Sequence, residues 1–471
     1  MRLSLLALLS LASSVFSLPT EPHAGPPPAR QQQAERRGEG GWGPAVQDPG
    51  TIVSLIPVRG ADAALYAWTR EGQDWEKLKR IVFVIHGKGR DPWNYLNHTT
   101  TALQDAIAAG QPVTDDEVGI WAPSFWNNQD GGAWPWDEAT QQPTSNLLVW
   151  SGNEWQDGGN SIYPSGLNLS SFEVLDNVVS FFSNRAIFPN VDSITFSSHS
   201  MGSQLLQKYA FLGDIPQGIP SLRFAIGNLG AFTYFDDQRP SNVGGAEPVE
   251  QCGDYNDYRF GLNNVDSTIE YGSPTPNREL LLERFKSRTF HLLLSQNDDG
   301  PGNLQCAAKT QGDSHRTRGA AWWEYMNGPM GGWPANHTLD WIPDCTHDDL
   351  CVFRSAQAQV RLFLNDSMQQ PSFMPNGPVN NLWSAGSVQW ARGANATQAM
   401  PTGTTLSTAA LQTYIPSSTT SGASGNATQA GGRQQTNGQV SSTNAAGATA
   451  TTAMQTLVLG AAMVGAGLLL V

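Results

Sequence analysis

One short segment combines a candidate nucleophile with the local structure needed to expose it. The segment Ser198-His-Ser200-Met-Gly202 follows an apolar, strand-like run from Ser193 and precedes a helix-like pattern that continues to Leu212. A serine on a tight strand-to-helix turn is exposed for attack, and the residues two before and two after it must be small. Gly202 meets this requirement, and Ser198 stands where glycine is usual. We predict that Ser200 is a nucleophile on such a turn.

A serine hydroxyl is a poor nucleophile until a base removes its proton. Where the serine stands on such a strand-to-helix turn, the catalytic histidine follows both the serine and the acid in the chain. His347 lies in a loop between the short apolar run Leu339–Ile342 and an apolar, helix-like segment. We predict that His347 is this base. Three other histidines in the region fit less well, because His291 falls inside a predicted strand, His315 at a predicted helix start and His337 ahead of the same apolar run.

The base needs an acid that holds its tautomer and stabilises the imidazolium. Asp298 and Asp299 directly follow a predicted strand that ends at Leu294, so either carboxylate has access to the carboxyl edge of a parallel sheet. We predict Asp298 as the acid and keep Asp299 as the alternative. Asp348 and Asp349 adjoin the predicted base in sequence, and such close neighbours rarely reach the same ring nitrogen with good geometry.

An oxyanion that forms during acyl transfer needs two backbone N–H donors. The amide of Met201 is one predicted donor, because it opens the helix after the nucleophile, where the helix dipole favours negative charge. The second is predicted in the loop His86-Gly-Lys88-Gly-Arg90, whose glycines let the backbone approach a substrate. Lys88 is the expected donor. A phosphate-binding reading of this loop is weak, because the lysine and serine or threonine spacing of a P-loop is absent.

These residues need a scaffold, and the chain around them alternates strand-like and helix-like segments. Such alternation predicts an α/β fold: a mostly parallel central sheet with helices on both faces. The run Ile81–Ile85 is continuously apolar and β-branched, which indicates a buried central strand. Further strands are predicted over 118–125, 193–198, 222–226, 290–294 and 339–342, and helices over 101–109, 172–182, 202–212 and 356–364.

Two loop-rich inserts interrupt this alternation. Trp126–Gly166 carries several tryptophans among Gly, Asn and Gln, and Phe232–Phe285 carries Cys252 with three aromatic residues. Long insertions at the strand ends of such sheets usually shape a pocket or a lid. The alternative, that any single tryptophan only packs a surface layer, is about equally supported by the sequence.

The two ends of the chain read as processing signals rather than as folded structure. Arg2 and the apolar run Leu3–Leu11 precede small residues that a signal peptidase cuts after. The uncharged tail Leu457–Val471 follows a polar spacer and small residues, which is the pattern of a GPI-anchor signal. The predicted organisation is a signal peptide (1–17), a disordered N-terminal segment (18–50), an α/β domain (51–390), a Ser/Thr-rich stalk (391–446) and a GPI-anchor signal (447–471).

Composition agrees with an extracellular location. The net charge of −14 argues against nucleic acid and against an anionic membrane surface as partners. An even number of cysteines suits disulfides in an oxidising compartment, and we predict Cys345–Cys351 around the base, with Cys252–Cys306 as the second bridge. Six sequons are candidate N-glycosylation sites: Asn97, Asn168, Asn336, Asn365, Asn395 and Asn426.

The assembled motifs resemble a known superfamily. The set formed by His86-Gly87, the serine turn, Asp298 and His347 resembles the α/β-hydrolases over Ile81–Leu364. The segments 252–261 and 306–319 look like parts of poorly characterised secreted hydrolases from fungi and bacteria, and the two ends look like those of a fungal cell-surface protein. The resemblance implies the α/β-hydrolase fold and a serine-hydrolase mechanism, and it does not imply a substrate.

The predicted activity is hydrolysis of a carboxylic ester, or of an amide, through an acyl-enzyme. This chemistry needs no metal and no organic cofactor, and the expected substrate is a small-molecule, cell-wall or lipid ester. Three alternatives stay open: a non-catalytic cell-surface protein on a hydrolase scaffold, a peptidase or acyltransferase with the same residues, and a metal-dependent hydrolase built on Cys345, His347 and Asp348. The last is the weakest, because a disulfide-bonded cysteine cannot bind zinc.

Overall fold

The computed structural model describes residues 41–42, 45–133, 136–137, 142–143, 145–272, 275–364 and 387–393. The predicted signal peptide, most of the predicted stalk and the predicted anchor signal lie outside these residues. Within them, none of the helices combines the length and the apolar character needed to cross a bilayer.

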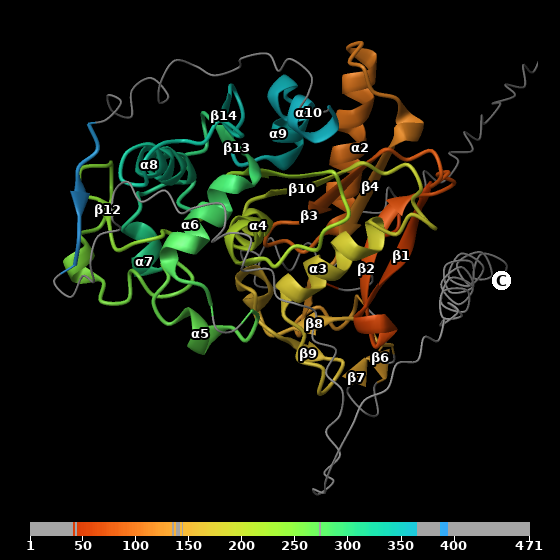
Figure 1. Ribbon diagram of the computed structural model, residues 1–471, viewed down its shortest axis with the longest axis horizontal. Helices are drawn as coiled ribbons and strands as arrows, with labels where there is room; N and C mark the ends of the chain where they lie inside the picture. Colours follow the sequence, from red (N-terminus) through yellow and green to blue (C-terminus); the bar gives the residue numbers. More distant parts are fainter. Residues whose placement is uncertain are drawn as a thin grey trace, which may run out of the picture.

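An eight-stranded sheet forms the centre of the domain (Figure 1). Its order is β1-β2-β4-β3-β10-β11-β13-β14; every pair from β4 to β14 is parallel, while β1–β2 and β2–β4 are antiparallel. The predicted α/β fold with a mostly parallel sheet is therefore confirmed. The strands are β1 (Thr51–Val58), β2 (Ala63–Arg70), β3 (Arg80–Ile85), β4 (Val118–Pro123), β10 (Ser193–His199), β11 (Ser221–Gly227), β13 (Thr289–Ser295) and β14 (His337–Ile342).

The central strand β3 shows why both faces of the sheet must be covered. All of its residues are buried, and its side chains alternate between two separate apolar cores. Ile81, Phe83 and Ile85 point into one core, and Val82 and Val84 point into the other, as the period of two in a strand requires. A strand that is apolar on both sides cannot face water, so helices pack on each face.

The helices divide between these two cores. Helices α2, α9 and α10 contribute to the core that contains Val82, and they contact one another (Figure 1). Helices α3, α4, α6 and α8 contribute to the core that contains Phe83. The helices are α2 (Pro92–Ala108), α3 (Ser171–Phe182), α4 (Met201–Leu212), α5 (Val265–Thr268), α6 (Arg278–Ser287), α7 (Cys306–Lys309), α8 (His315–Asn327), α9 (Asp349–Arg354) and α10 (Ala356–Phe363).

A pair of strands and two helices show how the structure departs from the expectation. The antiparallel pair β1–β2 was not predicted, and Pro57 within β1 is tolerated because β1 is an edge strand. Helix α2 begins at Pro92 rather than Thr101, and proline suits the first helical position because its missing N–H would have no partner there. Helix α6 occupies the end of the second predicted insert, where only loop was expected.

The inserts contain short elements. In the first, β5 (Trp126–Asn127), β8 (Val149–Trp150) and β9 (Ser161–Tyr163) form a small sheet, next to the 3-10 helix η3 (Glu154–Asp157). Trp150 and Trp155 are fully buried, so these two tryptophans belong to the core rather than to a surface layer. The remaining short elements are η1 (Arg59–Ala61), η2 (Asp115–Glu117), η4 (Val249–Gln251), the pair β6 (Trp136–Asp137) and β7 (Gln142–Pro143), and the pair β12 (Arg239–Pro240) and β15 (Trp390–Ala391).

The predicted N-terminal boundary of the folded domain is too late. Trp42 falls in the segment predicted to be disordered, yet its ring is buried and packs edge-on against Trp93 of α2. Composition indicated disorder because this single aromatic side chain stands among residues that form no core. A tryptophan buries a large apolar area, which is sufficient to hold an otherwise polar segment against the domain.

The sequons divide between described and undescribed residues. Asn97, Asn168 and Asn336 are exposed, so each is accessible for glycosylation. Asn365, Asn395 and Asn426 lie outside the described residues.

One carboxylate links the helix that follows the nucleophile to two other segments. Asp176 of α3 accepts hydrogen bonds from the hydroxyls of Tyr209 in α4 and Tyr271, each at 2.7 Å. Burial raises the pKa of Asp176 to about 7, against the opposing effect of the two tyrosine hydroxyls. Between about pH 4 and pH 7, Asp176 therefore stays protonated in the folded protein, whereas it has lost its proton in the unfolded chain.

We expect this proton uptake to make stability fall as pH rises through that window. Because an amide does not titrate, the Asp176→Asn variant should gain stability relative to the wild type between pH 4.5 and pH 7.5, by up to a few kcal/mol. Chemical denaturation at several pH values measures the difference. Asp62→Asn, at an exposed carboxylate, is the control. A stability difference that stays constant with pH would contradict the assignment.

Candidate active site

The serine turn has the strained geometry expected of an exposed nucleophile. Strand β10 ends at His199, α4 begins at Met201, and Ser200 between them has φ 65° and ψ −124°. A non-glycine residue rarely adopts this conformation, so its surroundings must hold it there. One such contact is the hydrogen bond from the Ser200 amide to the carbonyl of Gly227 on β11, at 2.9 Å.

Ser198 and Gly202, which flank this turn, are small because the neighbouring chain leaves no room for larger side chains. A Cβ atom added to Gly202 would lie 2.3 Å from the Oγ of Ser198 and 2.5 Å from the carbonyl oxygen of His86. Ser198 fits because its buried hydroxyl donates to the carbonyl of Ile85, the last residue of β3, at 2.7 Å. The departure from glycine at position 198 is therefore accommodated by a hydrogen bond to the neighbouring strand.

Ser200, His347 and Asp298 form a continuous hydrogen-bonded series. The Nε2 atom of His347 lies 3.0 Å from the Oγ of Ser200, and its Nδ1 atom lies 2.7 Å from the Oδ2 of Asp298. The side chain of Asp298 is 1% exposed. This tautomer leaves Nε2 free to accept the serine proton while Nδ1–H donates to the carboxylate.

The alternative acids have other partners. Asp299 is 66% exposed and pairs with Arg316. Asp348 caps α9 by accepting from the amide of Cys351, and Asp349 pairs with His98 of α2 at 2.6 Å. Among the acids weighed from the sequence, only Asp298 therefore contacts the imidazole of the predicted base. Of the other histidines, His291 hydrogen-bonds with Thr338 and His337 with the carbonyl of Phe285, both within the sheet region.

Two further histidines, whose part in the site the sequence reasoning missed, lie against His347. The ring of His315, at the start of α8, stacks on that of His347 with centroids 4.0 Å apart, and the ring of His199 lies tilted against that of His347 with centroids 4.5 Å apart. His315 also shares Asp298, since its Nδ1 atom lies 3.0 Å from Oδ1. Each histidine adjoins a predicted site element, His199 beside the nucleophile and His315 in a segment similar to other hydrolases, and that adjacency was the available signal.

The charges within this cluster follow from burial and hydrogen bonding. Burial alone would raise the pKa of Asp298, but hydrogen bonds from His315 and His347 outweigh it and hold that pKa well below its usual range. Burial lowers the pKa of His199 to about 3 and also lowers the pKa of His315. At neutral pH the cluster therefore holds one carboxylate anion next to neutral His199 and His315.

The loop after β3 runs alongside the nucleophile. A Cβ atom added to Gly87 would lie 3.4 Å from the Cβ of Ser200. His86 is fully buried and uses both ring nitrogens, because Nδ1 lies 2.9 Å from the carbonyl of Gly87 and Nε2 accepts from the amide of Phe125 at 2.9 Å. Burial lowers the pKa of His86 to about 3, so its ring is neutral. The predicted oxyanion donors, the amides of Met201 and Lys88, thus belong to two segments that meet at Ser200.

A buried ion pair anchors this loop from behind. The guanidinium of Arg90 donates to both oxygens of Asp130, at 2.7 and 3.2 Å, and the two side chains are 1% and 0% exposed. The same guanidinium donates to the carbonyl of Lys88 at 3.0 Å, and the indole of Trp42 donates to the carbonyl of Gly89 at 2.6 Å. The carbonyls of Lys88 and Gly89 are therefore both held by side-chain donors.

The base loop is closed by a disulfide. The predicted Cys345–Cys351 bridge is present, with Cα atoms 5.7 Å apart, and it encloses His347. The predicted Cys252–Cys306 bridge is not formed here: both cysteines are free thiols, although their side chains are within hydrogen-bonding contact of each other. Each thiol is instead directed to an oxygen, that of Cys252 to the carboxylate of Asp254 at 3.1 Å and that of Cys306 to a backbone carbonyl at 3.7 Å.

The cluster of Asp298, His315 and His347 also contains groups that suit a cation. One ligand atom from each of Asp298, His315 and His347 lies within 4.8 Å of the others, and a carboxylate with two imidazoles is a donor set that zinc accepts. An ion bound there would displace the Nδ1–H of His347 from Asp298 and so remove the contact that orients the base. Cation binding and the serine–histidine arrangement therefore exclude each other at these residues.

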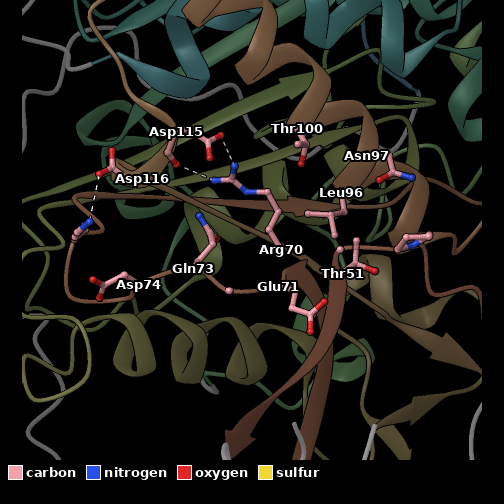
Figure 2. A pocket seen from close by; sticks show the side chains of 14 residues that line it. Thr51, Arg70, Glu71, Gln73, Asp74, Leu96, Asn97, Thr100, Asp115 and Asp116 are labelled. Carbon is pink, nitrogen blue, oxygen red and sulfur yellow. Dashed lines mark hydrogen bonds and ion pairs between the residues drawn. The ribbon is translucent and has the colours of Figure 1, made fainter. Parts of the chain in front are cut away.

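Two surface hollows lie away from the triad residues. One, of about 450 Å³, is lined mainly by the loop that follows β2, together with residues of α2 and η2; Figure 2 shows Arg70 paired with Asp115 in its wall. The other, of about 540 Å³, lies along the disulfide and the start of α9. Neither hollow is lined by Ser200, Asp298 or His347. The candidate active site is therefore defined by the hydrogen bonds among these three residues.

The strand order and the serine turn are those of the α/β-hydrolase fold, which agrees with the resemblance seen in the sequence. No protein-family model and no curated protein matches the chain.

Several solved structures are similar to the chain. Poly(aspartic acid) hydrolase-1 from Sphingomonas sp. KT-1 is 18% identical, with a TM-score of 0.42, and the aligned region covers 67% of this chain and 99% of the hydrolase chain. The LpqC poly(3-hydroxybutyrate) depolymerase from Bordetella parapertussis is 17% identical, with a TM-score of 0.42, and covers 70% and 92%. An IroE-like serine hydrolase from Shewanella oneidensis is 13% identical, with a TM-score of 0.34, and covers 64% and 79%. With identities below 20% and TM-scores below 0.5, these similarities carry no conclusion about this chain.

The anchoring of the oxyanion loop leads to a prediction. The Arg90→Gln variant should leave Asp130 as an unpaired buried charge and release the carbonyl of Lys88. We expect the rate constant for acylation of Ser200 by p-nitrophenyl acetate to fall by about 100-fold, with little change in KM, because the oxyanion forms only in the transition state. Stopped-flow measurement below the unfolding temperature gives both constants.

Arg361→Gln is the matched control. Arg361 makes a similar buried, two-contact pair with Asp340, between α10 and β14. Both variants should lose stability, because each leaves a carboxylate without its partner in the interior. Only Arg90→Gln should slow acylation per folded molecule. An equal loss of acylation in the two variants would show that general destabilisation, and not the loop, is responsible.

Proposed function

We propose that this chain is a secreted serine hydrolase that cleaves a carboxylic ester through an acyl-enzyme. The observation that carries the proposal is the series Ser200–His347–Asp298. Its two hydrogen bonds measure 3.0 Å (Ser200–His347) and 2.7 Å (His347–Asp298), and Ser200 stands on a strained strand-to-helix turn. A serine held in that conformation next to an oriented imidazole is suited to nucleophilic attack.

The steps follow from this arrangement. The Oγ of Ser200 attacks the ester carbonyl while Nε2 of His347 takes its proton. The tetrahedral intermediate places its negative oxygen near the amides of Met201 and Lys88. It collapses when the alcohol leaves with the proton from His347. Water then attacks the acyl-enzyme by the same route in reverse, which releases the acid and restores Ser200.

The substrate is proposed as an ester of a small molecule, a lipid or the cell wall. A peptidase or an acyltransferase would use the same residues, and no described contact favours either over an esterase. Acyl esters of graded chain length, assayed beside peptide amides and with added alcohol acceptors, separate the three. Hydrolysis of esters alone is the expected result.

The triad assignment is tested by labelling and by turnover. A fluorophosphonate probe should label Ser200, and Ser200→Ala should abolish both labelling and ester hydrolysis. His347→Ala should cost a similar factor because residues that act as a unit do not contribute additively. Asp298→Asn should cost about 10⁴-fold in kcat, as expected for an acid that fixes the tautomer of the base.

Asp299→Asn is the control for the acid, because it removes a neighbouring but exposed carboxylate. Its kcat should stay within about twofold of the wild type, since its charge is screened by solvent. Circular dichroism confirms that each variant is folded. Full ester turnover by a folded Ser200→Ala protein would refute the proposed mechanism.

We further propose that the mature protein is held at the cell surface by a GPI anchor near Asn444. The support is the sequence pattern of small residues, polar spacer and apolar tail over 441–471. Phosphatidylinositol-specific phospholipase C should release the protein from intact cells that express the full chain. Recovery of peptides from Leu457–Val471 in the membrane-bound protein would instead indicate a transmembrane tail.

A further inference from the structure

Asp298 is shared by two histidines rather than serving one. Its Oδ2 faces Nδ1 of His347 at 2.7 Å, and its Oδ1 faces Nδ1 of His315 at 3.0 Å. Both carboxylate oxygens are thus occupied by imidazole N–H donors. In a triad of serine, histidine and acid alone, a single histidine takes this role.

The fold places His315 at this position by several backbone contacts. Its amide donates to the carbonyl of Gly300 at 2.9 Å, and the amide of Arg316 donates to the carbonyl of Asp298 at 3.1 Å. Helix α8 starts with a capping box between Ser314 and Thr317, which fixes its first turn. A Cβ atom on Gly300 would lie 3.3 Å from both Oδ1 of Asp298 and Nδ1 of His315, so glycine leaves room for their contact.

Two histidine rings that are themselves held in place pack against the imidazole of His347. His315 stacks on it with an interplanar angle of 19° and is fixed through Asp298. His199 lies tilted against it at 51°, and its Nε2 atom lies 3.0 Å from the side-chain amide of Asn228. The ring that must transfer protons is therefore restrained by two neighbouring rings as well as at Nδ1.

The charged and titratable groups around His347 come from four elements. Asp298 follows β13, His315 opens α8, His199 ends β10, and Asp349 opens α9 beyond the base itself. Arg318 acts on the cluster through His315. Because burial keeps both flanking rings neutral, Asp298 is the anion that an imidazolium at His347 meets directly.

We propose that His315 is a positioning residue that fixes the carboxylate of Asp298 and, by donating a second hydrogen bond to it, weakens the hydrogen bond between that carboxylate and His347. The inference rests on the proposed function of the triad. A carboxylate that accepts a second hydrogen bond has less negative charge to offer the first donor. His315 thereby sets both the orientation of the base and the strength of its hydrogen bond to Asp298.

Two substitutions separate the two contacts of His315. His315→Phe keeps a ring stacked on His347 and removes the donor to Asp298. His315→Asn places an amide N–H near the original Nδ1 and removes the ring. For His315→Phe, the acid limb of kcat/KM should move to higher pH by about half a unit to one unit, and kcat should fall about tenfold as the carboxylate loses its fixed orientation. For His315→Asn, the acid limb should stay near that of the wild type.

The controls keep this test independent of folding and of the proposed function. Asp299→Asn should leave the acid limb unchanged, because its carboxylate is exposed and paired outside the cluster. NMR titration of ¹³C-labelled histidine in the free protein, with the His347 signal assigned by loss in His347→Gln, reads the same shift without any turnover. If Ser200→Ala keeps full activity, the proposed function fails while the NMR titration still reports on His315.

Two outcomes would overturn the role proposed for His315. An unshifted His347 titration in folded His315→Phe would show that His315 does not share the charge of Asp298. Equal losses of kcat in the two His315 variants, with unchanged pH profiles, would leave His315 a purely structural role. A shift confined to His315→Phe supports the proposal.

Discussion

The site depends on a carboxylate that is almost wholly removed from water. A buried anion is stable only when its oxygens are hydrogen-bonded or paired with charge. Asp298 meets this requirement with two imidazoles, one from the loop after β14 and one from the first turn of α8. The need to satisfy one side chain thus brings together three segments that are distant in sequence, and the base receives its orientation as part of the same arrangement.

The scaffold supplies what this carboxylate alone cannot. Parallel strands place the loops after β3, β10, β13 and β14 at one edge of the sheet, so the nucleophile after β10, the acid after β13 and the base after β14 share that edge. Each loop then has its own restraint: a strained turn at Ser200, a buried Arg90–Asp130 pair behind the glycine loop, and a disulfide around the base. Because these restraints are local, we expect that a variant can disturb one loop without unfolding the sheet.

The sequence indicated the parts of this structure in which local pattern and position coincide. Continuous apolar strands, the serine turn and the order Ser200, Asp298, His347 could be predicted, because each follows from periodicity or from steric limits on a short segment. The hairpin β1–β2 could not, since buried and partly exposed residues alternate irregularly along both strands and the edge strand β1 contains Pro57. The contacts of His199 and His315 were also out of reach, because a stack of rings from separate loops leaves no spacing in the chain. Trp42 was missed for a related reason: its partner, Trp93, lies in a different element.

The hydroxyl of Ser198 adds a mechanical link that glycine would not provide. By donating to the carbonyl of Ile85, it ties the nucleophile turn to the last residue of β3, directly before the glycine loop. The turn and the loop are therefore coupled to one another as well as to the sheet. Thermal displacement of either segment carries the other with it, so the separation between Ser200 and the glycine loop fluctuates less than their absolute positions do.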